Sequence, residues 1–212
     1  MDGFKVRKRS FYNSKGSEVS EEIYQKEYKT FEEDRNKTYN AIIKTIISEI
    51  PGDISDKEKL ELLYKYLVSN INYDYQVLEK PSHDGHVYSV YYPFKDWGNF
   101  KISSSEKYGT MILKIGICEG IAKVFEDIAN MIGISCKTIN GKTKIINEET
   151  GVRLGHCWNM IHTQDGEKHI DVTYGIFNKD KKDDEMNYFY LSSDELKQIG
   201  PHCNFENFLT KK

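Results

Sequence analysis

The chain has 212 residues, of which 38% are hydrophobic and 30% are charged, and its formal net charge is −3. This length is sufficient for one hydrophobic core, and the composition is typical of a globular protein and not of a disordered one. The charge balance gives no indication of nucleic-acid binding, and no apolar run reaches the roughly 18 residues that a membrane-spanning helix needs.

The N-terminal residues and the cysteines say little about the compartment. No apolar signal core follows the basic residues at positions 5–9, so we expect a cytoplasmic protein by default, or a secreted or surface protein if a leader has been removed. Four cysteines scattered over a chain of this length do not indicate a disulfide scaffold, and the absence of a C-x-x-C pair argues against a zinc knuckle. They are Cys118, Cys136, Cys157 and Cys203.

The first predicted element is a helix over residues 21–50, which follows a polar tail. Five isoleucines between positions 42 and 50 form one apolar stripe at helical spacing, and Pro51-Gly52 ends it. We assign residues 1–52 to an N-terminal tail and helical extension, and residues 53–212 to the main domain.

A second helix begins at Ser55, where "SDKE" has the form of a capping box with Glu58 as the reciprocal partner. Residues 76–105 follow as an irregular but ordered segment, because its many aromatic rings must pack somewhere. His83 and His86 lie three residues apart in it, but no carboxylate or cysteine completes a metal site. We therefore expect no metal and no cofactor.

The next helix runs from Cys118 to about residue 131, and Gly133 is placed to end it in the left-handed conformation. Short segments rich in branched and aromatic residues follow, separated by the turn dipeptides Asn140-Gly141 and Asp165-Gly166. They predict an antiparallel meander that extends to residue 175. Residues 187–200 predict a strand and a capped helix. Helices followed by strands favour an α+β fold, with the helices on one face of the sheet.

Cys118 lies in "GICEG", between two glycines at the predicted start of a helix. A helix N-terminus lowers the pKa of a thiol, and its free amides can hold an oxyanion. On this interpretation Gly116 permits a turn and Gly120 leaves room for a substrate beside the sulfur. The alternative is a buried structural cysteine beside two incidental glycines.

A cysteine nucleophile also needs a base and a group that orients the base. His156 lies in an apolar predicted strand, and Asp171 lies between Ile170 and Val172, where an unpaired charge would be costly. If Asp165-Gly166 formed a tight hairpin, however, His156 and Asp171 would be about four residues out of register, or roughly 13 Å along the strands. Their pairing then requires a wider loop, a bulge or another register.

Taken together, these segments resemble the transglutaminase-like superfamily of cysteine enzymes. The resemblance covers about residues 53–194 and rests on three ordered motifs, at residues 107–141, "LGHCWNMI" at 154–161 and "HIDVTYG" at 169–175. Residues 55–75 and 188–196 resemble the flanking segments. It implies a papain-like arrangement, with Cys118 as nucleophile, His156 as base and later acid, and Asp171 as the orienting group on an adjacent strand.

The resemblance also points to two supporting residues. Tyr108 lies where many members carry an aromatic residue, so it is a candidate oxyanion donor, with core packing as the alternative. Trp158 is expected to be a wall of the site and not a reacting group. Cys157 replaces a frequent alanine, and a structural Cys118–Cys157 disulfide is a further alternative.

We therefore expect cysteine-dependent acyl transfer on protein or peptide amides through an acyl-thioester. A peptidase or amidase is slightly favoured because water is always available, whereas a protein-glutamine transglutaminase needs a second site for its amine. A non-catalytic peptide-binding module of the same fold is the other alternative, with the aromatic segment from Tyr88 to Phe100 as its surface.

Overall fold

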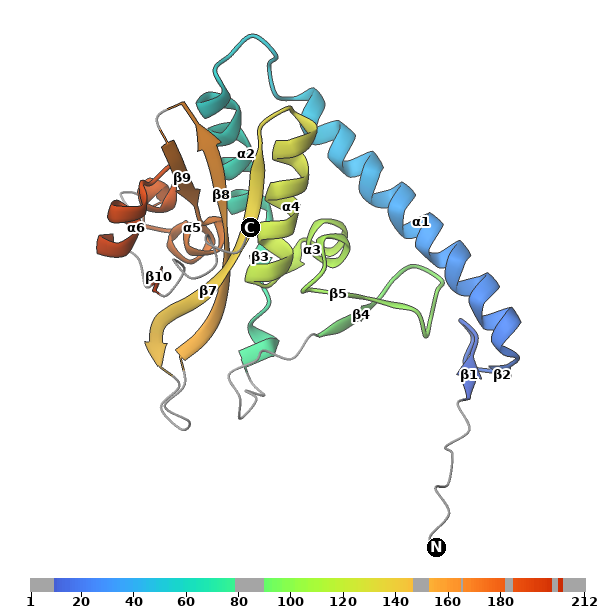
Figure 1. Cartoon of the computed structure of the whole chain (residues 1–212). Coiled ribbons are helices and arrows are strands. Elements are labelled where there is room, and N and C mark those ends of the chain that lie inside the picture. Colours follow the sequence, from blue (N-terminus) through green and yellow to red (C-terminus); the bar gives the residue numbers. More distant parts are fainter. Residues whose placement is uncertain are drawn as a thin grey trace, which may run out of the picture.

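The computed structural model describes residues 10–78, 90–146, 153–164, 166–181, 185–199 and 202–203. Its fold is α+β, as predicted, and its main sheet has four antiparallel strands in the order β10-β7-β8-β9. These strands are β7 (Cys136–Ile146), β8 (Arg153–Thr163), β9 (Gly166–Ile170) and β10 (His202–Cys203). Helix α4 (Cys118–Met131) packs against β7 and β8 (Figure 1).

The long helix α1 (Glu21–Ser48) begins at Ser20, whose side chain accepts a hydrogen bond from the amide of Ile23. It extends away from the sheet toward the short strands β1 (Phe11–Tyr12) and β2 (Glu18–Val19) (Figure 1). Its C-terminal half contributes buried side chains, Ile43 among them, to the main core. The predicted helix over 21–50 is therefore present and is packed into the core of the chain.

Helix α2 (Asp56–Asn70) begins with the predicted capping box. The Glu58 amide donates to the Ser55 hydroxyl, and the Glu58 carboxylate accepts from the Ser55 amide at 2.9 Å. Strand β3 (Asn72–Tyr73) and the 3-10 helix η1 (Tyr75–Leu78) follow. The main core lies between α1, α2, α4 and the sheet.

The part of the aromatic segment that the structure describes forms a hairpin of β4 (Tyr91–Pro93) and β5 (Lys101–Ser103). Phe94 and Phe100 pack with Phe31 of α1 in a second, smaller core. The prediction of an ordered aromatic segment holds for these residues, whereas His83 and His86 lie outside the described part of the chain. In the described ranges no three His, Cys, Asp or Glu side chains cluster as metal ligands would. No helix there is apolar and long enough to cross a membrane.

Helix α3 (Lys107–Leu113) and strand β6 (Ile115–Gly116) lead directly into α4. The predicted start of α4 at Cys118 and its end at residue 131 agree with the structure. Gly133 adopts a φ of +87°, which is the left-handed conformation that the sequence predicts.

Two turn and strand predictions in the second half of the chain are wrong. Asn140-Gly141 is not a turn, because both residues lie within β7, opposite Cys157 and His156 of β8. Residues 172–178 are not the end of a strand but the short helix α5, which Asp171 caps through the amide of Tyr174.

The C-terminal elements also differ in part. The 3-10 helix η2 (Glu185–Tyr188) and a single bridge from Leu191 to His169 replace the predicted strand. Helix α6 (Ser193–Ile199) is present, and Ser192 and Glu195 form its capping box.

The glycines around Cys118 have a different purpose from the predicted one. A Cβ at Gly116 would lie 2.6 Å from the hydroxyl of Thr110, and a Cβ at Gly120 would lie 2.5 Å from the carbonyl oxygen of Ser104. Neither glycine has a positive φ. They allow the start of α4 to lie directly against α3 and the end of β5, instead of making a turn or leaving room for a substrate.

We expect Gly120→Ala to destabilise the fold by about 1–3 kcal/mol, because a backbone carbonyl cannot move aside as a flexible side chain can. Chemical denaturation measures the change. Gly52→Ala is the matched control, since a Cβ at Gly52 meets nothing within 4 Å. Equal stability of the two variants would contradict this account of Gly120.

Candidate active site

Cys118 is the first residue of α4, where the helix presents its free amides. The preceding residue, Ile117, is the N-cap, and its aliphatic side chain cannot accept a hydrogen bond from these amides. The backbone amide of Ile117 donates to the carbonyl of Ser104 at 3.0 Å, which fixes the approach to the helix. The half-buried thiol of Cys118 therefore lies at a helix N-terminus that no N-cap side chain satisfies.

His156 and Asp171 form a buried pair beside this thiol. Nε2 of His156 lies 2.6 Å from Oδ2 of Asp171, and the two side chains are 5% and 0% exposed. The other carboxylate oxygen of Asp171 accepts from the amide of Tyr174 at 3.1 Å. Asp171 is thus held by an imidazole and by the N-terminus of α5, which compensates the cost of burying its charge.

The register of β8 and β9 differs from the predicted hairpin, which would place His156 and Asp171 too far apart to pair. Thr163 pairs with Gly166 and Asn159 with Ile170, so β8 and β9 pair in a different register from that of the predicted hairpin. This register brings His156 and Asp171 about two residues, or roughly 7 Å, closer along the strands than the prediction. The chain also leaves the sheet at Asp171, since β9 ends at Ile170 and α5 begins at Val172.

The electrostatics favour a charged pair of Cys118 and His156. A hydrogen bond from the thiol of Cys157 and another from His156 hold the pKa of Cys118 well below its ordinary value, against the effect of burial. Burial lowers the pKa of His156, but the charge of Asp171 and hydrogen bonds to Asp171 and Cys118 outweigh it and raise this pKa to about 10. These opposite shifts favour a thiolate and an imidazolium over a neutral thiol and imidazole.

The same shift links the pair to stability. The pKa of His156 is higher in the folded chain than its ordinary value of 6.5. The interactions of protonated His156 therefore stabilise the fold fully below pH 6.5. This contribution is lost as the pH rises through about 10.

Cys157 contacts the nucleophile candidate without being bonded to it. Cys118 and Cys157 are both free thiols, so the alternative of a structural disulfide between them is wrong for this structure. The sulfur of Cys157 lies 2.9 Å from Oδ1 of Asn140, and its pKa is raised, first by its hydrogen bond to Cys118 and then by burial. Sequence reasoning missed Asn140, because it placed this residue in a turn and not opposite Cys157.

Trp158 lies beside His156, with the two rings stacked at 5.9 Å between centroids. The indole N–H donates to Nδ1 of His169 at 3.1 Å, and Nε2 of His169 lies 3.0 Å from the Ser193 hydroxyl. His169 therefore accepts at one nitrogen and donates at the other, as a neutral histidine does. These hydrogen bonds hold the indole of Trp158 in a fixed position beside His156, at the side of the site.

Tyr108 lies on α3 among core residues. Its ring packs edge-on against Tyr39 at 5.3 Å, and the guanidinium of Arg35 lies 4.0 Å from the ring centre. These contacts correspond to the packing alternative that the sequence left open for this residue.

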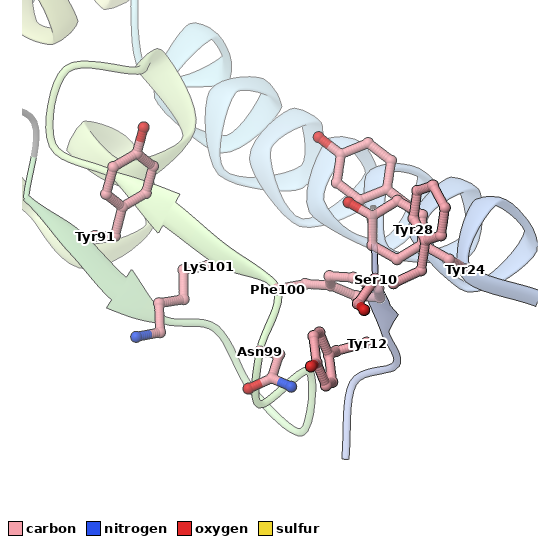
Figure 2. Close-up of a pocket in the computed structure, with 9 residues that line it drawn as sticks. Ser10, Tyr12, Tyr24, Tyr28, Tyr91, Asn99, Phe100 and Lys101 are labelled. Atoms are coloured by element: carbon pink, nitrogen blue, oxygen red, sulfur yellow. The ribbon is translucent and has the colours of Figure 1, made fainter. Parts of the chain in front are cut away.

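A separate hollow of about 880 Å³ lies at the N-terminal end of α1. Figure 2 shows the rings of Tyr24 and Tyr28 on the helix, with Tyr91 and Lys101 on the β4–β5 hairpin. Part of the predicted aromatic surface, including Phe100, thus lines a real depression, but Cys118 and His156 do not belong to it.

Comparison with known proteins gives distant similarities. No family model matches the chain. The mouse (Mus musculus) kyphoscoliosis peptidase is 22% identical over 160 residues, which are 70% of this chain and 21% of that protein. The chain therefore spans only 21% of the length of this curated relative.

Among solved structures, one described as "Crystal structure of a TGase" has 14% sequence identity and a TM-score of 0.48. The match covers 79% of this chain and 37% of the solved chain. At these identities neither match identifies reacting residues, and the candidates are the side chains that the structure brings together: Cys118, His156 and Asp171.

We expect iodoacetamide to alkylate Cys118 at pH values where an ordinary thiol no longer reacts, because the pKa of Cys118 is lowered and only the thiolate reacts. The rate should fall as the pH drops through this lowered pKa. In Asp171→Asn the pKa of His156 falls and the imidazolium is lost. The pH at which the alkylation of Cys118 declines should then move up toward the ordinary thiol pKa of about 8.5. Peptide mapping by mass spectrometry over a pH series measures the extent of Cys118 alkylation in the wild type and in the variant. Asp127→Asn is the control, since Asp127 binds Tyr39 and Lys107 instead.

Cys157→Ala removes a hydrogen bond to the thiolate of Cys118. The pH at which the alkylation of Cys118 declines should therefore move up by roughly one pH unit. Cys157→Ser keeps a donor at the same position and should restore most of the shift. Cys136→Ala should change nothing, because burial raises the pKa of Cys136 to about 12 and it lies elsewhere in the core. If Cys118 were alkylated with the same pH dependence in both Cys157 variants as in the wild type, a role for the Cys157 thiol would be excluded.

Proposed function

We propose that the chain is a transglutaminase-like cysteine enzyme that cleaves protein or peptide amides through an acyl-thioester. The observation that carries the proposal is the buried His156–Asp171 pair, 2.6 Å apart, beside Cys118 at the N-terminus of α4. In this proposal residues 53–212 are the catalytic domain and residues 1–52 are its N-terminal extension.

Each residue has a defined step in the proposed reaction. The Cys118 thiolate attacks the amide carbonyl, and the free amides at the start of α4 stabilise the oxyanion. The His156 imidazolium gives its proton to the leaving nitrogen as the C–N bond breaks, so the amine departs neutral. His156 then takes a proton from water as the water attacks the thioester and the C–S bond breaks. A carboxylic acid and the Cys118 thiolate are released, and His156 is again an imidazolium.

Asp171 acts through His156 in this scheme. Its carboxylate holds the ring by Nε2, so the other nitrogen, Nδ1, is the one that faces the reaction. Its negative charge also keeps His156 protonated at neutral pH, which supplies the acid for the first step. In a Ser-His-Asp triad, exchange of the aspartate for asparagine lowers turnover by about 10⁴-fold because the histidine adopts the wrong tautomer.

Hydrolysis is the favoured outcome because water needs no binding site of its own. The mouse relative is named a peptidase, which is consistent with this outcome. Transfer of the acyl group to an amine would make the chain a protein-glutamine transglutaminase, and the site would need to exclude water for that reaction.

A mixed peptide library that includes glutamine-containing peptides tests the proposal, with and without an added primary amine. Mass spectrometry should detect amide cleavage or deamidation by the wild-type chain, and Cys118→Ala should lower it by about 10³-fold or more. Cys136→Ala controls for the loss of a thiol. Incorporation of the amine in place of water would identify a transglutaminase instead.

A chain that binds peptides but changes none of them, with Cys118 no more reactive than Cys136, would contradict the enzyme and favour a binding module. Cys118 and Cys136 suit this comparison because their pKa values are shifted in opposite directions. The pKa of Cys118 lies well below its ordinary value and that of Cys136 is about 12, so the rates of alkylation at neutral pH should differ widely.

A further inference from the structure

An aromatic cluster lies next to the reacting side chains and takes no part in the steps above. It consists of Tyr73 and Tyr75, on and after β3, and Tyr174 and Phe177 on α5. We call these four residues the aromatic wall.

The backbone fixes one half of the wall to the segment that carries the nucleophile. Tyr73 pairs with Gly116 in the parallel β3–β6 ladder, and the amide of Asp74 donates to the carbonyl of Gly116 at 2.9 Å. Cys118 follows Gly116 by two residues. Burial raises the pKa of Tyr73 first, and the charge of Cys118 adds to this rise, as expected for a phenol that lies near the sulfur.

The other half is fixed to the base. The Tyr174 ring lies edge-on to the His156 ring, with 5.2 Å between their centroids. Tyr174 belongs to α5, whose N-cap is Asp171, so the helix that holds the orienting carboxylate also carries this part of the wall.

The two halves meet in continuous ring contacts. The Tyr73 ring lies 4.8 Å from Phe177 and 5.2 Å from Tyr75, and Phe177 lies 5.6 Å from Tyr174. A hydrogen bond of 3.3 Å from Lys179 to the side chain of Asn72 joins the same two segments. The wall therefore has a fixed shape beside both Cys118 and His156.

Its outer rings are open to solvent. Tyr75 is 60% exposed and Phe177 is 38% exposed, although a ring that serves only to pack would be covered. Scattered exposed apolar residues are ordinary, but a rigid aromatic surface that adjoins a nucleophile and its base offers apolar contact area where a substrate must lie.

We propose that the aromatic wall selects substrates with an aromatic or large aliphatic side chain next to the scissile amide. Such a side chain would cover Tyr75 and Phe177 and lose its own contact with water. This inference rests on the proposed function, because it assumes that Cys118 attacks a peptide carbonyl. It adds the class of substrate, which the reacting residues do not specify.

Two chloromethyl ketones test the wall without a known substrate. In one, a phenylalanine side chain flanks the reactive carbonyl, and in the other a glycine does. We expect the first to alkylate Cys118 roughly tenfold faster or more, after each rate is normalised to that of iodoacetamide. The double variant Tyr75→Ala, Phe177→Ala should bring the ratio close to one. Both side chains are exposed, so this variant should fold.

Tyr12→Ala is the matched control, since Tyr12 is 49% exposed and lies on β1, far from α5 (Figure 1). It should leave the ratio as in the wild type. A wild-type ratio near one, or a ratio that the double variant does not change, would overturn the wall while selective iodoacetamide labelling of Cys118 left the proposed function standing. If iodoacetamide did not prefer Cys118 to Cys136, the proposed function would fail, and the wall with it.

Discussion

The buried carboxylate of Asp171 is the constraint on which the arrangement of the site depends. A charge at this depth is tolerated only with close compensation, and here His156 and the first turn of α5 supply it. The same residue ends β9 and begins α5, so satisfying its charge also decides where the chain leaves the sheet. The placement of His156, the proposed base, the direction of α5 and the position of Tyr174 all follow from this point.

Cys118, the proposed nucleophile, is positioned by a second set of contacts that does not involve Asp171. Helix α4 delivers Cys118 through tight packing of its first turn against α3 and β5, while its free amides favour negative charge on the sulfur. Cys157 reaches the same sulfur from β8. His156 of β8 thus contacts a residue at each of two helix N-termini, Cys118 of α4 and Asp171 at the cap of α5, and each terminus favours one anion, a thiolate or a carboxylate.

Much of this could be predicted from sequence where the signal is local. The capping box at Ser55 and the left-handed Gly133 depend on a few neighbouring residues, and both agree with the structure. The sequence predicts strand for residues 172–175 because of their β-branched and aromatic content, whereas the cap at Asp171 begins the helix α5 there. Asn140 was misplaced because Asn-Gly usually turns. Contacts across strands depend on register, which composition does not determine.

The packing of Gly120 has a consequence for how related chains should be compared. Its missing side chain is what allows α4 to approach the Ser104 carbonyl, and this contact takes no part in any chemical step. A relative could therefore keep the cysteine, histidine and aspartate and yet lose the geometry through one added methyl group. Evolutionary loss of activity in such a chain would leave the reacting residues unchanged and would be recorded only in the spacing between a helix and its neighbour.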